Sequence, residues 1–337
     1  MNDKYIRAGE IASEVCNIIP KFNISPSSGF RSRCEFGYKD NNYTMINNGK
    51  KVFLKSFDIA HPSINRLMPK LLKVVNTNKL LKHKLFQVNF RCNNKLNLMV
   101  SLIYHKEINS ELFEQSTILS NSLNIQVILR SKKKYFSTSN NLLEEIIESK
   151  KPYSLFQTDQ TFFQPNRFMV PRMVDLVSDM IEKPADLLEL YCGCGTFTIA
   201  LAGIFDNVFA TENNRKSIEC LDKAIEKNNL TNINYARLSC DEVMRAINGH
   251  IYTRLKGVNI QNYNFSHILV DPPRSGLTLD VIDLINNFDN VIYISCNIET
   301  FVRDIKLLNR FKISKLEFFD QFVNTPHIEL VSYITKK

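Results

Sequence analysis

The chain has 337 residues and a net charge of +9, with 44% apolar and 23% charged residues, which excludes a disordered protein. Single hydrophobic cores stop growing at roughly 250–300 residues, so we expect two domains. The sequence shows neither a signal-peptide pattern nor an apolar run of roughly 20 residues, so we expect a cytoplasmic protein rather than a secreted or membrane one.

Positive charge is concentrated in the first half of the chain. Residues 1–160 hold 24 Lys and Arg against 13 Asp and Glu, a balance of +11, whereas residues 161–337 hold 19 and 21, a balance of −2. Such asymmetry indicates a nucleic-acid-binding unit joined to a unit of another kind. A general bias of the composition towards Lys and Asn is the alternative explanation.

Alternating patterns predict several strands in this basic half. Residues 30–36 alternate with period 2, and residues 84–91 and 96–104 repeat the pattern and could form a hairpin. Residues 110–123 have the pattern of an amphipathic helix. In residues 130–136 basic side chains stand beside aromatics, which suits an RNA backbone with exposed bases, although a solvated turn explains the run equally well.

From about residue 170, helical stretches alternate with short apolar strands. The strands are expected at 187–191, 208–212, 233–238, 267–272 and 291–296. This order predicts βαβ units and a mostly parallel sheet, in which ligands bind outside the carboxyl ends of the strands. The residues that could carry chemistry collect at those ends.

The eight cysteines are scattered and are expected to be free thiols. No C-x2-C pair occurs, and Cys192 and Cys194 have no second pair nearby to complete a metal site. We therefore expect neither a metal ion nor an iron–sulfur cluster. The cysteines expected to be core residues are Cys16, Cys34, Cys92, Cys220 and Cys240.

The first strand of the second half leads into a glycine turn, E-L-Y-C-G-C-G-T-F at 189–197. Glycines there let the backbone approach a ligand at a helix N-terminus. Thr198 fills the slot of the third glycine that an NAD site prefers. Glu212 ends the second strand, where a carboxylate can accept both ribose hydroxyls, unless it is a surface acid or a helix cap. The combination resembles the adenosylmethionine-binding class of methyltransferases.

The fourth strand ends in D-P-P-R-S-G-L at 271–277. Methyltransferases that act on exocyclic amines usually carry an aromatic after such a Pro-Pro pair, and Arg274 occupies that slot here. RNA cytosine-5-methyltransferases carry a cysteine in this loop, and this loop has none. Both departures favour a uracil as the methyl acceptor.

Cys296 follows the fifth strand and precedes a helix expected at 299–308. Carbon 5 of uracil is a poor nucleophile, but a thiolate that adds to carbon 6 creates an enolate whose carbon 5 can accept a methyl group. A base must then remove the carbon-5 proton. A helix N-terminus lowers a thiol's pKa, so we expect a Cys296 thiolate, with a buried core cysteine as the alternative.

Four blocks of the chain resemble, in order, the motifs of the RNA uracil-5-methyltransferases. They are F-F-Q-P-N at 162–166, D-P-P-R-S-G-L at 271–277, Y-I-S-C-N-I-E-T at 293–300, and D-Q-F through H-I-E at 320–329. Within the family, H-K-L-F-Q at 83–87 and V-S-L-I-Y-H-K at 100–106 most resemble the bacterial enzymes that make ribothymidine at uridine 54, in the T-loop of tRNA. The resemblance covers nearly the whole chain.

The resemblance implies a fold, a cofactor and a partner. Residues 1–165 would form a basic α+β RNA-binding domain. Residues 166–337 would form a Rossmann-like, class I methyltransferase domain with a mostly parallel seven-stranded sheet. S-adenosyl-L-methionine would be the cofactor, and tRNA, or another RNA with a T-like loop, the partner.

Carried over residue by residue, the resemblance makes Cys296 the nucleophile and Glu329 the general base. The residues expected to line the pocket of cofactor and uracil are Gln164, Tyr191, Thr196, Glu212 and Asp271. The residues expected to contact RNA are Phe86, His105, Phe162 and Arg274. Without the resemblance, Glu329 could be an edge-strand charge, and Phe86 could be a core residue that shares the parity of Val88 and Phe90.

The chain departs from the motifs at a few positions. Ile298 and Val323 replace prolines, and Pro326 stands where a histidine is often found. Because proline stiffens a loop, we expect these changes to affect turnover and stability rather than the type of reaction.

Three other functions compete with this interpretation. Enzymes that apply the same chemistry to ribosomal RNA usually carry clustered iron–sulfur cysteines and often an added β-barrel, which this sequence lacks. A non-catalytic RNA-binding or RNA-folding protein would not need an intact Cys296 and Glu329. An amine-directed methyltransferase is disfavoured by Arg274 and leaves Cys296 without a role.

Overall fold

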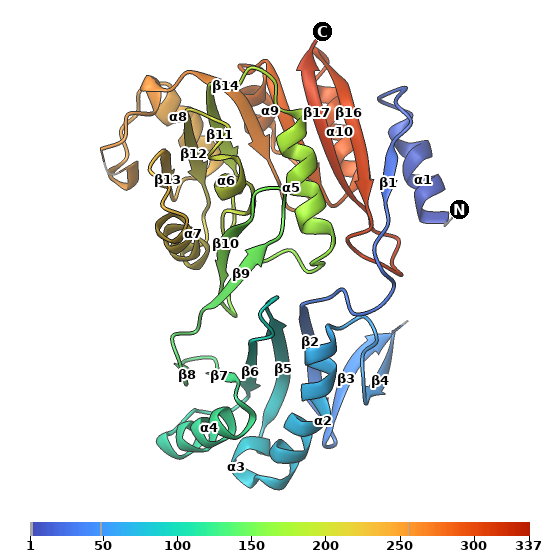
Figure 1. The fold of residues 1–337 in the computed structure, drawn as a ribbon, viewed down its shortest axis with the longest axis vertical. Coiled ribbons are helices and arrows are strands. Elements are labelled where there is room, and N and C mark those ends of the chain that lie inside the picture. The colour runs from blue at the N-terminus through green and yellow to red at the C-terminus, as the bar shows by residue number, and fades with distance from the viewer. Residues whose placement is uncertain (1–2, 48, 256) are drawn as a thin grey trace.

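Two large β-sheets, one in each half of the molecule, organise the computed structural model, which describes residues 3–47, 49–255 and 257–337. In Figure 1 the sheet built mainly from the C-terminal half lies above the sheet built from the N-terminal half. We call them the upper and lower units. Within the described ranges, no helix is long and apolar enough to cross a membrane.

The upper sheet has eight strands in the order β1-β16-β17-β15-β14-β11-β12-β13. Their bounds are β1 (Lys21–Asn23), β11 (Asp186–Leu190), β12 (Asn207–Thr211), β13 (Ile233–Ala236), β14 (Phe265–Val270), β15 (Asn290–Ser295), β16 (Phe311–Phe319) and β17 (Glu329–Lys336). Only β17 among these runs antiparallel to its neighbours. The mostly parallel seven-stranded sheet predicted from the sequence is confirmed, and β1 adds an eighth strand at its edge.

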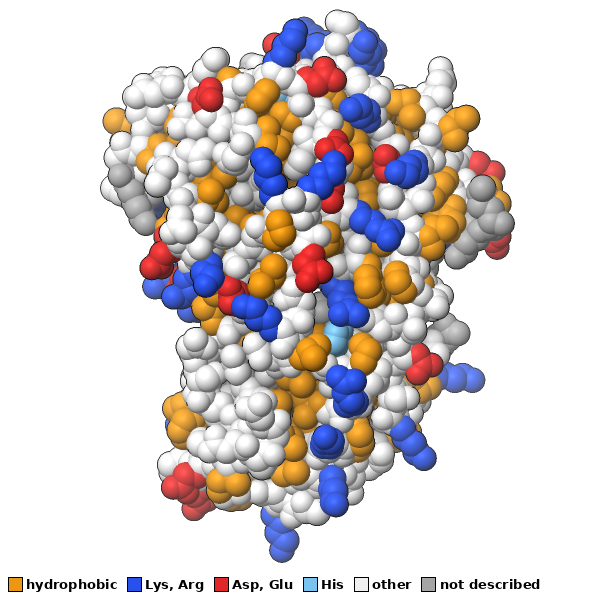
Figure 2. All heavy atoms as spheres, viewed as in Figure 1, with side chains coloured by type: hydrophobic (Ala, Val, Ile, Leu, Met, Phe, Trp, Pro, Cys, Tyr) orange, Lys and Arg blue, Asp and Glu red, His pale blue; other side chains and the backbone are white. Residues whose placement is uncertain are grey.

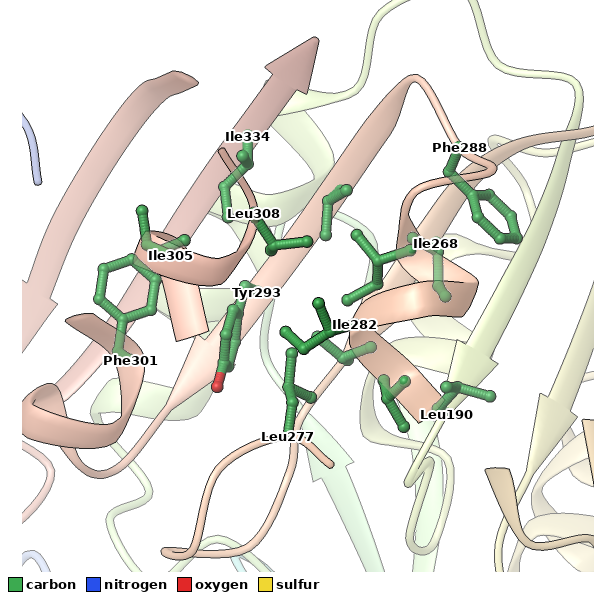
Figure 3. Close-up of a cluster of buried hydrophobic side chains, with 14 of the residues drawn as sticks. Leu190, Ile268, Leu277, Ile282, Phe288, Tyr293, Phe301, Ile305, Leu308 and Ile334 are labelled. Carbon is green, nitrogen blue, oxygen red and sulfur yellow. The ribbon is translucent and has the colours of Figure 1, made fainter. Parts of the chain in front are cut away.

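Helices cover both faces of the upper sheet, because each face buries its own cluster of apolar side chains. One face is covered by α5 (Met169–Met180), α6 (Thr196–Leu201) and α7 (Arg215–Lys227). The other is covered by α1 (Asp3–Ala12), α8 (Cys240–Ile247), α9 (Leu279–Ile285) and α10 (Ile298–Leu307). Figure 3 shows buried side chains of α9 and α10 on this face, among them Ile282, Phe301 and Ile305. Two short 3-10 helices, η1 (Thr253–Leu255) and η2 (Ile260–Asn262), lie between α8 and β14.

The lower sheet has seven strands in the order β4-β3-β2-β5-β6-β7-β8. Their bounds are β2 (Arg33–Lys39), β3 (Asn42–Asn47), β4 (Lys50–Leu54), β5 (Leu85–Cys92), β6 (Leu98–Tyr104), β7 (Gln126–Arg130) and β8 (Tyr135–Ser137). Its apolar core packs under α2 (Pro62–Thr77), α3 (Lys79–Lys82) and α4 (Ser110–Leu123). The antiparallel hairpin of β5 and β6 and the helix at 110–123 confirm the sequence predictions.

A two-stranded ribbon, β9 (Leu143–Ile147) and β10 (Tyr153–Gln157), connects the lower unit to the upper one. The beginning of the chain differs from the predicted division at residue 165. The first strand, β1, pairs with β16, and Tyr5, Ala8 and Ala12 of α1 enter the core of the upper unit. The chain therefore starts in the upper unit, passes down through the lower unit and returns.

Basic side chains mark the face of the lower unit that Figure 2 shows. Helix α2 contains no acidic residue, and its Arg66, Lys70 and Lys73 are exposed at helical spacing. This distribution agrees with the excess of Lys and Arg in the first half of the sequence, and gives that unit a surface suited to phosphates.

Candidate active site

The candidate active site lies where the parallel strands β11, β14 and β15 end, on the side of the upper sheet that faces the lower unit. The loops that follow these strands carry Tyr191, Asp271 and Cys296. Strand ends in such sheets are the usual place for ligands, because the chain must cross from a strand to a helix there.

Cys296 is half-buried in a short loop between β15 and α10. Asn297 caps α10 by accepting a hydrogen bond from the Glu299 amide at 3.1 Å, and its Nδ2 donates to the carbonyl of Arg274 at 3.1 Å. The Ser295 hydroxyl donates to the carbonyl of Asn297 at 3.0 Å. These bonds fix the thiol to the loop that carries Arg274.

The electrostatic environment of Cys296 differs from the sequence expectation of a thiolate. Burial, followed by the carboxyl groups of Glu329 and Asp271, raises the pKa of the Cys296 thiol to about 11, although Arg274 acts in the opposite direction. The lowering of the thiol pKa by the helix N-terminus is smaller than the increase caused by burial and two nearby acids. The thiol is therefore protonated in the free protein at neutral pH.

Glu329 is the first residue of β17, and its side chain is 2% exposed. Burial raises its pKa well above the ordinary value, Asp271 raises it further, and Arg274 lowers it. Burial also raises the pKa of Asp271 to about 7. The structure thus brings Cys296, Glu329, Asp271 and Arg274 into one electrostatic cluster, although they come from two loops and a strand that are separate in the sequence.

A cavity of about 180 Å³ opens beside Cys296. Arg274, Pro326 and His327 line one side of it. Helix α1 lines another side with Lys4 and Arg7, a contribution that the sequence analysis did not anticipate. No local pattern could have revealed it, because α1 is separated from Cys296 by most of the chain.

The loop at 271–277 is shaped by the buried carboxylate of Asp304. It accepts hydrogen bonds from the Leu277 amide at 2.9 Å and from the Tyr293 hydroxyl at 2.6 Å. Figure 3 shows Leu277, at the end of this loop, and Tyr293 of β15 among the buried side chains of the core. Gly276 has a φ of +75°, and an added Cβ would lie 2.6 Å from Asp304 Oδ2, so only glycine fits this turn.

The glycine turn after β11 has the features of a nucleotide cradle. Gly193 has a φ of +56°, and an added Cβ there would meet open space, which leaves room for a ligand. Glu212 accepts hydrogen bonds from the Gly193 amide at 3.1 Å and the Asn214 amide at 2.8 Å. Tyr191 adopts a positive φ of +61°, and Thr196 opens α6. A turn of this kind beside a carboxylate fits an adenosine-containing cofactor.

Gln164 joins two of the sequence motifs. Its side chain is buried, and its Oε1 accepts a hydrogen bond from Gln321 Nε2 at 2.6 Å. Nearby, the fully buried Asn166 donates from Nδ2 to the carbonyl of Asp320 at 3.2 Å. The Q-P-N and D-Q-F motifs are therefore parts of one hydrogen-bonded structure.

Phe86 and His105 lie outside the core and stack on each other. Their ring centroids are 4.1 Å apart at an interplanar angle of 19°. The Phe86 side chain is 47% exposed, although Val88 and Phe90 are buried. A register shift between Leu85 and Gln87 explains the difference, because it changes which face the following residues occupy. The core alternative for Phe86 was wrong.

Phe162 is 59% exposed at the edge of a second cavity, of about 500 Å³, between the two units. Arg31, Arg33 and Phe36 of the lower unit line the same cavity. Among the residues with described positions, no group of three His, Cys, Asp or Glu side chains could hold a metal ion.

Fold and site together define a class I methyltransferase with an added N-terminal unit. The crystal structure of the Pyrococcus abyssi tRNA (uracil-54, C5)-methyltransferase, in complex with S-adenosyl-L-homocysteine, superposes with a TM-score of 0.79 at 21% identity. The match covers 99% of this chain and 83% of that one.

Comparison of the sequence with known families and proteins identifies the family. The family described as tRNA (Uracil-5-)-methyltransferase matches residues 2–337, and the chain belongs to this family. The tRNA/tmRNA (uracil-C(5))-methyltransferase of Campylobacter lari is 42% identical over 316 residues, covering 90% of both chains. The protein with the same name in Saccharophagus degradans is 39% identical over 325 residues, covering 93% of this chain and 89% of its own.

Proposed function

We propose that this protein methylates carbon 5 of a uracil in tRNA, at uridine 54 of the T-loop, with S-adenosylmethionine as methyl donor, in the cytoplasm. The observation that carries the proposal is the convergence of Cys296, Glu329 and Asp271 on one strand-end cluster beside the glycine turn. Membership of the tRNA (Uracil-5-)-methyltransferase family and the names of the relatives support the substrate.

In the proposed reaction, the Cys296 thiol releases its proton to solvent, and the resulting thiolate adds to carbon 6 of the uracil. Carbon 5 then carries the negative charge and becomes a nucleophile. The bound cofactor supplies an electrophilic methyl group on its sulfonium sulfur. After transfer, carbon 5 holds both the new methyl group and its original proton.

Glu329 completes the reaction by accepting that proton. The C5–H bond breaks, its electron pair restores the C5–C6 double bond, and the Cys296 sulfur leaves as a thiolate. Glu329 acts in its carboxylate form, and its raised pKa makes that carboxylate a stronger base than an ordinary one. The Arg274 guanidinium, which already acts on both groups, offsets the negative charge of the cluster.

The cofactor would occupy the cradle of the glycine turn. Glu212 would hold the ribose hydroxyls, and the Thr196 backbone would face the cofactor at the start of α6. Gln164, Tyr191 and Asp271 would separate the cofactor from the uracil and orient both. Gln164 is well suited, because its hydrogen bond to Gln321 keeps its side chain in one orientation.

The lower unit would bind the RNA. Its basic surface suits phosphates, and the exposed Phe86–His105 pair offers a flat aromatic face. Extruding a uracil from a folded loop costs a few kcal/mol. Stacking of an unpaired base on this pair would recover roughly 1–3 kcal/mol. Phe162 and Arg274 would contact the extruded nucleotide at the mouth of the site.

One assay tests the proposal against its alternatives. Labelled cofactor is incubated with unmodified tRNA and with ribosomal RNA, and the product nucleoside and its position are mapped. We expect 5-methyluridine at a single T-loop position of tRNA. Methylation of ribosomal RNA instead would establish the ribosomal alternative, and tRNA binding without any methylation would establish a non-catalytic RNA-binding protein.

A further inference from the structure

The loop between β16 and β17, residues 320–328, is anchored by the N-terminal helix α1. Lys4 forms a buried ion pair with Asp320, and its Nζ also donates to the carbonyl of Phe322 at 3.2 Å. The Tyr5 hydroxyl donates to Asp320 Oδ2 at 2.9 Å. Both side chains of the ion pair are 5% exposed, so solvent does not screen the interaction as it would at the surface.

Asp320 is held from two further directions through its backbone. Its amide donates to the carbonyl of Asn23 at 2.9 Å, and its carbonyl accepts from Asn166 Nδ2 at 3.2 Å. The side-chain contacts from α1 complete this arrangement. A residue bonded through its amide, carbonyl and carboxylate has little freedom to move.

The position of Asp320 matters because it determines where Glu329 lies. Asp320 directly follows Phe319, and Phe319 pairs with Glu329 in the register of β16 and β17. Any shift of Asp320 is therefore passed to the residue beside Glu329. The end of the same loop, at Pro326 and His327, lines the cavity next to Cys296.

The nucleophile has a separate support. Cys296 is fixed through Ser295 and Asn297 to the loop of Arg274, and these bonds do not involve α1. Loss of the Lys4 and Tyr5 contacts leaves the exposed ion pair between Arg7 of α1 and Glu299 of α10 in place, so it should disturb Glu329 more than Cys296. The two halves of the reaction, addition by the thiol and removal of the proton, can therefore be separated by experiment.

We propose that Lys4 and Tyr5 are positioning residues for Glu329. By locking Asp320, they hold the Glu329 carboxylate against carbon 5 of the bound uracil. This inference rests on the proposed covalent reaction, in which Glu329 takes the carbon-5 proton as the C6–S bond breaks. In this loop Val323 replaces a proline of the family motif, and the contacts from α1 would supply rigidity that the proline no longer provides.

The test is Lys4→Met, which keeps the length of the side chain and removes its charge. Turnover on unmodified tRNA should fall about 10- to 100-fold, the loss typical of a misplaced catalytic group. A methylated covalent complex should accumulate at the same time. On 5-fluorouracil-substituted tRNA, which lacks the carbon-5 proton, the rate of adduct formation should stay within about twofold of wild type.

Three further variants make the test specific. Lys4→Arg retains the ion pair and should restore most of the turnover. Tyr5→Phe removes a single hydroxyl, is expected to fold, and should give a smaller loss of the same kind. Glu14→Gln breaks the exposed ion pair between Glu14 and Lys306, close to the end of α1, and should leave both rates unchanged.

Three outcomes would overturn the proposal. One is an equal loss of adduct formation and turnover in Lys4→Met and Tyr5→Phe, which would make the contacts merely stabilising. Another is unchanged turnover in Tyr5→Phe with an unfolded Lys4→Met. The third is a wild-type protein that forms no adduct with 5-fluorouracil tRNA. This outcome would refute the covalent reaction itself, and it is distinguishable from failure of the positioning role because it is observed without any substitution.

Discussion

At the scale of single residues, the Cys296 thiol is the most consequential group, because its environment keeps it protonated. A thiol with a pKa of about 11 reacts slowly with oxidants and alkylating agents at neutral pH, since only the thiolate is a strong nucleophile. The environment of Cys296 thus protects the thiol from such reagents in the free protein. The sequence argument from a helix N-terminus alone would have assigned a reactive cysteine.

Replacement of the nearby acids should make Cys296 reactive. In Asp271→Asn, a negative charge that raises the thiol pKa is gone, so the thiolate fraction at pH 8 should increase about 3- to 10-fold. Glu329→Gln should show its effect towards the alkaline end of the range, where this buried acid is ionised. The measurement is the rate of alkylation by iodoacetamide between pH 7 and pH 11, with Cys296→Ala as the background. Unchanged rates in both variants would show that burial alone sets this pKa.

Cys296→Ala should abolish methylation and leave RNA and cofactor binding largely intact, because the thiol acts after binding. Wild-type protein should form a complex with 5-fluorouracil-substituted tRNA that survives denaturation, since fluorine does not leave as a proton. Gel electrophoresis under denaturing conditions detects that complex. Residual methylation by Cys296→Ala would point to a different nucleophile.

Glu329→Gln should fail at a later step than Cys296→Ala. Addition and methyl transfer can proceed in this variant, but the carbon-5 proton remains, so the methylated protein–RNA complex should accumulate on ordinary tRNA. Mass spectrometry of the trapped nucleotide would identify the added methyl group. Normal turnover in this variant would return Glu329 to a structural role and require another base.

At the scale of elements, the β5–β6 hairpin illustrates what a sequence pattern predicts and what it misses. Period-2 alternation predicted both strands and their pairing. The alternation placed Phe86 on the same face as Val88 and Phe90, because the amino-acid sequence does not indicate the register shift after Leu85. One irregular residue moves Phe86 from the core to the surface and pairs it with His105.

The exposed pair provides a test of RNA recognition. Phe86→Ala and His105→Ala should each weaken tRNA binding about 5- to 150-fold, the loss expected from roughly 1–3 kcal/mol of stacking. The melting temperature should change little, because both side chains are solvent-exposed. The slope of affinity against salt should also persist, because no phosphate contact is removed. A lowered melting temperature with normal binding would contradict the proposal.

In the candidate site, too, some residues could be predicted from the sequence and others could not. Strand-end positions and motif spacing predicted Cys296, Asp271 and Glu212, because in a parallel sheet these positions converge whatever the details of packing. The contribution of α1 could not be predicted. Tyr5 and Asp320 are 315 positions apart, and neither lies in a pattern that marks a contact partner.

At the scale of the whole molecule, a buried acid at the junction of the units links stability to pH. Glu145 lies beside Arg167, and its side chain is 6% exposed. One oxygen accepts from the Asn94 amide at 3.2 Å, and the other has no partner within the described part of the chain. Burial raises the Glu145 pKa from 4.5 to about 8.

The sign of the effect follows from proton binding. Between pH 4.5 and pH 8 the folded state retains a proton that the unfolded state loses, so this group lowers the free energy of unfolding as pH rises. The slope is at most about 1.4 kcal/mol per pH unit. Glu145→Gln should therefore raise the melting temperature at pH 8.5 relative to wild type, with little gain at pH 5. Parallel melting curves across this range would contradict the assigned pKa.

The return of the chain to its starting unit has a practical consequence for anyone who handles the protein. On the ribosome, α1 and β1 are made before the lower unit and β16 after it, so β1 cannot pair until the lower unit and most of the upper sheet have been made. The N-terminal helix finally docks beside the Cys296 cavity, whereas the C-terminus lies at the opposite end of the sheet. A purification tag is best kept away from α1, because this helix lines the candidate active site.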